Sequence, residues 1–177
     1  MLRQILKAAC LAPLALLLCQ CDALKPKAPS PYAADVTLKF TPMAAAALAQ
    51  AKDNIVVLAY FYGDPKPEAK AKADNLGRLV LGSERSGWSN NTRLVHLSGK
   101  IDASLLPSIR GEPQLLVSVY SVMPDGSSDD LIACKTWIGT VKGAQARSPV
   151  IGCELETGDK DSADDLVGSA SDSSGRP

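Results

Sequence analysis

The stretch Ile55–Tyr62 reads IVVLAYFY, and it is apolar or aromatic at every position. Successive side chains of a strand point to opposite faces, so this strand would carry two apolar faces. Strands with that pattern are buried on both sides. We therefore expect Ile55–Tyr62 at the centre of the domain, covered on each face by another element.

Six further stretches have the pattern of strands. Asp35–Phe40 (DVTLKF) alternates Val36, Leu38 and Phe40 with polar residues, which is the period of a half-buried strand. A mainly β fold follows, with about seven antiparallel strands in a two-layer β-sandwich of immunoglobulin-like or transthyretin-like type. The remaining five candidate strands are Arg78–Leu81, Thr92–Leu97, Leu115–Val122, Leu131–Ile138 and Val150–Leu155.

One short helix is expected between the first two strands. Thr41 has the side chain of an N-cap, Pro42 suits the first helical position, and the alanine-rich run MAAAALAQAK follows. A helix of this length is marginal alone in water, so it should pack on Ile55–Tyr62. A second helical turn is expected after Asp102, before Arg110–Pro113 breaks the chain.

Two polar stretches are expected to be loops. Lys66–Asp74 (KPEAKAKAD) has the composition of a solvated loop or a helical turn. Gly82–Asn91 (GSERSGWSNN) is expected to be a polar loop that carries Trp88. That tryptophan would either contact a ligand or fold back on the sheet edge, and the second reading is favoured.

The first residues have the features of an export signal. Arg3 and Lys7 precede an apolar segment, Ala8–Cys19, whose length suits the apolar part of a signal peptide. The segment is too short to span a bilayer, which takes about 20 apolar residues.

The residues Leu18-Cys19-Gln20-Cys21 resemble the lipobox of bacterial lipoproteins, in which an aliphatic residue lies three positions before the acylated cysteine. The resemblance covers only the first 22 residues, and Gln20 stands where family members usually carry Gly, Ala or Ser. It implies that residues 1–20 are a signal peptide and that Cys21 is lipidated. The alternative is cleavage after Ala23 and simple secretion. If Cys21 is lipidated, the proline-rich residues 21–34 are a lipid-anchored tether.

The cysteine count supports an exported domain. Removing the signal discards Cys10 and Cys19, and lipidation uses Cys21, which leaves Cys134 and Cys153 of the five. An even remainder in an oxidising compartment predicts one disulfide. Each cysteine lies on the more apolar side of its strand, so the bridge is expected at the core edge.

Length and charge set the domain plan. Residues 35–156 suffice for one β-sandwich domain, and residues 157–177, with five Asp against one Lys and one Arg, are expected to be a disordered acidic tail. Without Arg3 and Lys7 the chain has 17 basic and 19 acidic residues, from the 19 of each in the full sequence. No basic patch is visible, so nucleic acid is not an expected partner.

Residues able to do chemistry are few. His96 is the only histidine and lies inside a strand. Asp125, Asp129 and Asp130 cluster in a turn, where calcium is one reading and ordinary turn chemistry the favoured one. The run Tyr60-Phe61-Tyr62 would line an apolar groove or, in the favoured reading, belong to the core. We expect no cofactor, no metal site and no enzyme.

The functional expectation rests on the anchor and on this lack of catalytic groups. We expect a lipid-anchored protein of the bacterial cell envelope, facing the periplasm or the outside. It would be a non-enzymatic binding or assembly module that docks another envelope protein through a sheet edge or loops. The alternatives are an inhibitor that blocks a cell-wall hydrolase with a loop such as Ser83–Asn91, and a secreted, soluble periplasmic binding domain.

Overall fold

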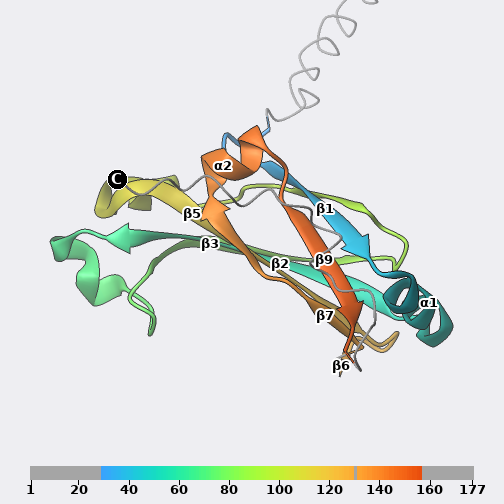
Figure 1. Cartoon of the computed structure of the whole chain (residues 1–177). Helices are drawn as coiled ribbons and strands as arrows, with labels where there is room; N and C mark the ends of the chain where they lie inside the picture. Colours follow the sequence, from blue (N-terminus) through green and yellow to red (C-terminus); the bar gives the residue numbers. More distant parts are fainter. Residues whose placement is uncertain (1–28, 130, 157–177) are drawn as a thin grey trace, which may run out of the picture.

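The computed structural model describes residues 29–129 and 131–156. The expected signal peptide, the lipidated Cys21 and the acidic tail lie outside these residues. The described part is mainly β, as predicted, and its nine strands form two sheets (Figure 1). The four-stranded sheet has the order β4-β1-β9-β7 and contains β4 (Leu94–Leu97), β1 (Ala34–Phe40), β9 (Val150–Leu155) and β7 (Ile132–Cys134).

The five-stranded sheet has longer strands. Its order is β3-β2-β5-β6, and β8 also pairs with β5. Its members are β3 (Leu79–Trp88), β2 (Asn54–Pro65), β5 (Ile109–Val122), β6 (Ser128–Asp129) and β8 (Trp137–Thr140). Side chains from both sheets form one hydrophobic cluster, so the arrangement is sandwich-like. Its largest fully buried members include Phe61, Leu38, Leu48, Ile55, Leu97, Leu115 and Ile151.

Not every strand pair is antiparallel. β1 and β9 pair in parallel, with Leu38 opposite Ile151 and Phe40 opposite Cys153. The other pairs are antiparallel. Because β1 and β9 run the same way, both strands end at the same end of the domain, beside α1 (Pro42–Ala51).

The expectation that Ile55–Tyr62 is covered on both faces is wrong. Ile55, Val57, Ala59 and Phe61 are fully buried between the sheets. The alternate residues of β2 are only partly covered from Leu58 onward, because no second layer packs on that side in the described part of the chain. The run Tyr60-Phe61-Tyr62 is therefore split, with Phe61 in the core and both tyrosines outside.

The expected single strand Leu131–Ile138 is two strands in different sheets. β7 pairs with β9, and after the corner at Lys135 and Thr136 the chain enters β8, which pairs with β5. The crossing reverses the expected sides. Alternation along one continuous strand would put Ile138 on the same face as Cys134, but Ile138 is 60% exposed on the outer side, while Trp137 packs against the core.

Two expected interruptions are absent. Ser83–Trp88, expected to be a loop, continues β3, so the loop from β3 to β4 contains only Ser89–Arg93. Arg110–Pro113 lies within β5, where Gly111 has a φ of 72° and the pairing with β2 shifts register between Tyr62 and Asp64. The glycine absorbs the distortion, since a positive φ costs it little.

The helix after β1 is confirmed, with a different packing partner. The Thr41 side chain accepts a hydrogen bond from the Ala44 N–H, and Pro42 opens α1. Ala44 and Leu48 are buried, and α1 packs mainly against β9, not β2. It is also not the only helix of the described chain, which includes α2 (Val141–Ala146) and the 3-10 helices η2 (Pro67–Lys72) and η3 (Ala103–Ser108).

Cys134 and Cys153 form the expected disulfide. They are directly opposite each other on β7 and β9, with Cα atoms 4.1 Å apart. Cys153 is fully buried and Cys134 half-buried, so the bridge lies at the edge of the core. It ties the three-residue strand β7 to its neighbour.

The last residues of the expected tether contact the domain. Ser30 Oγ donates to the Gly99 carbonyl at 2.7 Å, and Gln145 Nε2 of α2 donates to the carbonyls of Pro31 and Ala33. A Cβ on Gly99 would lie 2.2 Å from the carbonyl carbon of Tyr32, so only glycine permits this approach. The chain thus enters the domain beside α2. Among the described residues there is no helix long and apolar enough to cross a membrane.

Candidate functional site

The outer side of the five-stranded sheet is the candidate functional site. Residues directly opposite each other in neighbouring strands share a face, and these pairings define the outer side. Tyr60 of β2 is opposite Ser83 and Leu116, and Leu116 is opposite Ile138. We call this surface the tyrosine face, defined by Val56, Leu58, Tyr60, Tyr62, Arg78, Val80, Arg85, Leu116, Tyr120 and Ile138.

The outer side of the four-stranded sheet has a different character. It presents Asp35, Lys39 and His96, and the His96 Nδ1 lies 2.8 Å from Asp35 Oδ1 across β1 and β4. Leu94 is the large apolar side chain that is well exposed there, at 60%. This surface therefore has the ordinary polarity of a solvated sheet.

One end of the tyrosine face is built around Arg78. Its guanidinium carbon lies 5.0 Å from the ring centroids of both Tyr60 and Tyr62, and such stacking is favourable for arginine. The same guanidinium is 3.1 Å from Asp74 Oδ2, which also accepts the Tyr60 hydroxyl at 3.0 Å. The charge of Arg78 is thus neutralised within the protein.

Hydrogen bonds to Asp74 lower its pKa to about 2. The largest contribution is from the backbone N–H of Arg78, followed by the Tyr60 hydroxyl, the Arg78 side chain and the Leu76 N–H, while partial burial opposes the shift. Burial, and then the bond to Asp74, raise the pKa of Tyr60. Asp74 is therefore an ionised anchor for this end, not an acid that could donate a proton near neutral pH.

The other end is built around Arg85. Its Nε donates to the Tyr120 hydroxyl at 2.8 Å. Arg85 is opposite Leu58 and Tyr120 is opposite Val56, so this bond passes over β2. That accounts for the low exposure of Val56, which is 3%.

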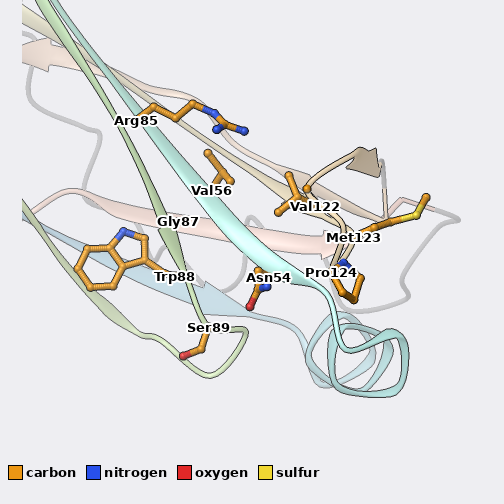
Figure 2. A pocket seen from close by; sticks show the side chains of 10 residues that line it. Asn54, Val56, Arg85, Gly87, Trp88, Ser89, Val122, Met123 and Pro124 are labelled. Atoms are coloured by element: carbon orange, nitrogen blue, oxygen red, sulfur yellow. The ribbon is translucent and has the colours of Figure 1, made fainter.

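A hollow of about 420 Å³ adjoins Arg85 at this end (Figure 2). Figure 2 shows the Arg85 side chain extending toward Val122, with the Trp88 ring on the other side of β3. Asn90, two residues after Trp88, donates from its side chain to the Leu48 carbonyl of α1, so the hollow lies at the α1 end of the domain. Its lining residues are Asn54, Val56, Arg85, Gly87, Trp88, Ser89, Val122, Met123, Pro124 and Gly126.

The residues considered for chemistry do not converge. His96 is paired with Asp35 on the opposite sheet, and Asp125 accepts hydrogen bonds from the backbone and hydroxyl of Ser127 in its own turn. The side chains of Asp129 and Asp130 lie outside what the structure describes. Within residues 29–129 and 131–156 there is no group of three potential metal-ligating side chains.

The Trp88 side chain folds back on the sheet, as favoured from the sequence. Its indole Nε1 donates to Ser86 Oγ at 2.8 Å, and the ring packs against the core. Arg85, Tyr120 and Ile138 do not stand out in the sequence. Arg85 lies in the polar run Gly82–Trp88, whose composition fits an edge strand as well as a loop.

No protein-family model matches the chain, and no curated protein or solved structure matches it either.

Proposed function

We propose that this protein is a non-enzymatic binding module of the bacterial cell envelope and that it docks a partner protein on the tyrosine face. The observation that carries the proposal is the contrast between the two outer surfaces. The tyrosine face combines three tyrosines, two arginines and exposed Ile138, whereas the opposite surface has a solvated polar composition. Tyrosine and arginine are enriched at the energetic centres of protein interfaces.

The partner we propose is a protein surface with apolar side chains at its centre and a carboxylate at its edge. The apolar part would cover Leu58, Leu116 and Ile138, which form the middle of the face. The carboxylate would meet Arg85, because Arg78 is already neutralised by Asp74. This arrangement follows the usual anatomy of an apolar core with a polar rim.

Cellular placement rests on the first 22 residues. A lipidated Cys21 would hold the domain at a membrane. Residues 30–34 contact the domain beside α2. The hollow lies at the other end, beside α1, so it would point away from that membrane. Mass spectrometry of the cellular protein before and after Cys21→Ser tests the anchor. An unmodified N-terminus at Leu24 would exclude it and leave the secreted alternative.

The finer fold type is also a proposal. We infer an immunoglobulin-like or transthyretin-like β-sandwich, supported by two stacked, largely antiparallel sheets around one core. An inhibitory loop at Ser83–Asn91 has no support from the local geometry, because most of that segment belongs to β3.

Site-specific photocrosslinking tests the docking surface. A photoreactive residue would replace Ile138 on the tyrosine face or Leu94 on the opposite surface, a matched pair because each is 60% exposed. In intact cells, position 138 should form a discrete adduct with one envelope protein, and position 94 should not. Adducts of equal yield from both positions, or from position 94 alone, would contradict the proposal.

A further inference from the structure

The hollow at the α1 end combines a cation with an apolar wall. Val56 and Val122 form much of its floor and are 3% and 7% exposed, whereas Met123 at its rim is 41% exposed. Arg85 is the one cationic residue of the lining. A site of this kind suits a ligand with an aliphatic group beside an anionic one.

Arg85 has no anionic partner within the described residues. Its interactions there are the hydrogen bond to the Tyr120 hydroxyl and the stacking on that ring, with 5.9 Å from the guanidinium carbon to the centroid. Only Nε is used, which leaves the terminal nitrogens as donors. A planar guanidinium held at Nε can present a two-pronged donor to a carboxylate.

The two arginines of the tyrosine face are therefore in opposite states. Arg78 pairs with Asp74 and stacks between two rings. Arg85 is held instead by one tyrosine hydroxyl, that of Tyr120, and has no carboxylate partner within the described residues. Asp125, in the β5–β6 turn, already accepts hydrogen bonds from the backbone and hydroxyl of Ser127. A carboxylate that pairs with Arg85 would therefore come from outside the described fold.

We infer that the hollow binds an acidic peptide segment of the partner, in which a carboxylate side chain meets Arg85 and a neighbouring aliphatic side chain packs on the exposed Met123 at the rim. The inference rests on the proposed function and specifies the partner's chemistry at one end of the face. Charge complementarity carries it, because a buried or half-buried apolar floor alone would accept any aliphatic group.

The test is a titration of the full-length mature protein, observed by nuclear magnetic resonance. The probes are the acetylated and amidated pentapeptides Gly-Asp-Leu-Val-Gly and Gly-Asn-Leu-Val-Gly. The acidic peptide should shift the signals of Arg85 Nε and of the Met123 methyl. The Asn peptide should bind at least about tenfold more weakly. Equal binding of both peptides, or no binding of either, overturns the inference.

Protein variants separate the site from general charge. Arg85→Gln should weaken binding of the acidic peptide at least about tenfold. The affinity of Arg85→Lys should lie between those of Arg85→Gln and the wild type, since lysine keeps the charge and loses the two-pronged donor. Arg147→Gln, at the α2 end, is the matched control and should bind as the wild type does. Unchanged amide spectra would show that each variant folds. An equal loss in the Arg147 variant overturns the inference.

Two outcomes would redirect the assignment. If the peptide binds only after Asp164 and Asp165 are replaced by asparagine, the chain's own acidic segment occupies the hollow and the external partner is excluded. If the acidic peptide does not bind but position 138 still crosslinks to one protein, this inference is overturned and the proposed function stands.

Discussion

The outer surfaces of the two sheets differ more than their inner surfaces do. Inside, both sheets contribute fully buried aliphatic residues, such as Val36 from one and Val57 from the other. Outside, the four-stranded sheet presents the Asp35–His96 pair, while the five-stranded sheet presents rings, arginines and Ile138. Core packing explains the inner faces in full. It does not explain why only one outer surface is rich in aromatic residues, and this difference is what supports the proposed docking surface.

The largest predicted effect separates the two sides of one strand. Phe61→Ala should lower the free energy of unfolding by about 3–5 kcal/mol, because it leaves a cavity between the sheets. Tyr62→Ala, next in the chain but on the tyrosine face, should cost clearly less. Urea unfolding of both variants gives the comparison. Equal losses would mean that the tyrosine face is as well packed as the core.

The second-largest effect on the free energy of unfolding is expected from the disulfide, which lies in the four-stranded sheet. Replacing both Cys134 and Cys153 by alanine opens a link between residues 19 apart and should cost about 3 kcal/mol on the chain-entropy estimate. The double variant avoids a free thiol. Partner binding at fixed temperature should be unchanged if the variant is folded. A stability change below about 1 kcal/mol would show that β7 is held by packing alone.

Acid should weaken the Arg78 end of the tyrosine face. Since the pKa of Asp74 is lowered from 3.8 to about 2, its ionised form stabilises the fold above pH 3.8, and that contribution is lost as the pH falls from 3.8 to about 2. As the pH falls across this window, the midpoint temperature of thermal unfolding should therefore fall more steeply for the wild type than for Asp74→Asn. Identical slopes for wild type and Asp74→Asn would contradict the assignment.

The smallest effect is expected on the opposite surface. Asp35→Asn removes the carboxylate that faces His96, but both side chains are more than half exposed, at 51% and 62%. Exposed pairs of this kind contribute about 0–1 kcal/mol. Chemical unfolding should detect a change within that range, with no effect on partner binding. A loss of binding would move the functional surface to the four-stranded sheet.

The inner half of the fold was predictable because it depends on local alternation. Val36 and Leu38 are buried as their two-residue period indicates, and Ile55 and Phe61 are buried as expected for an apolar strand. Thr41 also caps α1 as its sequence context predicts. These features need only neighbouring residues, so a single sequence carries them.

The outer half was not predictable because it depends on distant segments. Whether Tyr60 and Tyr62 are covered is decided by where other elements pack, and α1 packs mainly on β9 instead of on this face. The corner at Lys135 and Thr136 is a second case. Lys135 still donates to the Gly152 carbonyl of the four-stranded sheet, and two residues later the chain is in β8 of the other sheet. Alternation read through such a corner assigns Ile138 to the wrong side.

The most direct test of the docking surface is the affinity of the crosslinked partner, once purified, for Ile138→Asp and Leu94→Asp. Each change places a charge on a residue that is 60% exposed, so stability should change by no more than about 0.5 kcal/mol. Titration calorimetry should show at least a tenfold rise in Kd, about 1.4 kcal/mol, for Ile138→Asp and a Kd within about twofold of wild type for Leu94→Asp. Equal affinities of the two variants, or a loss confined to Leu94→Asp, would contradict the account.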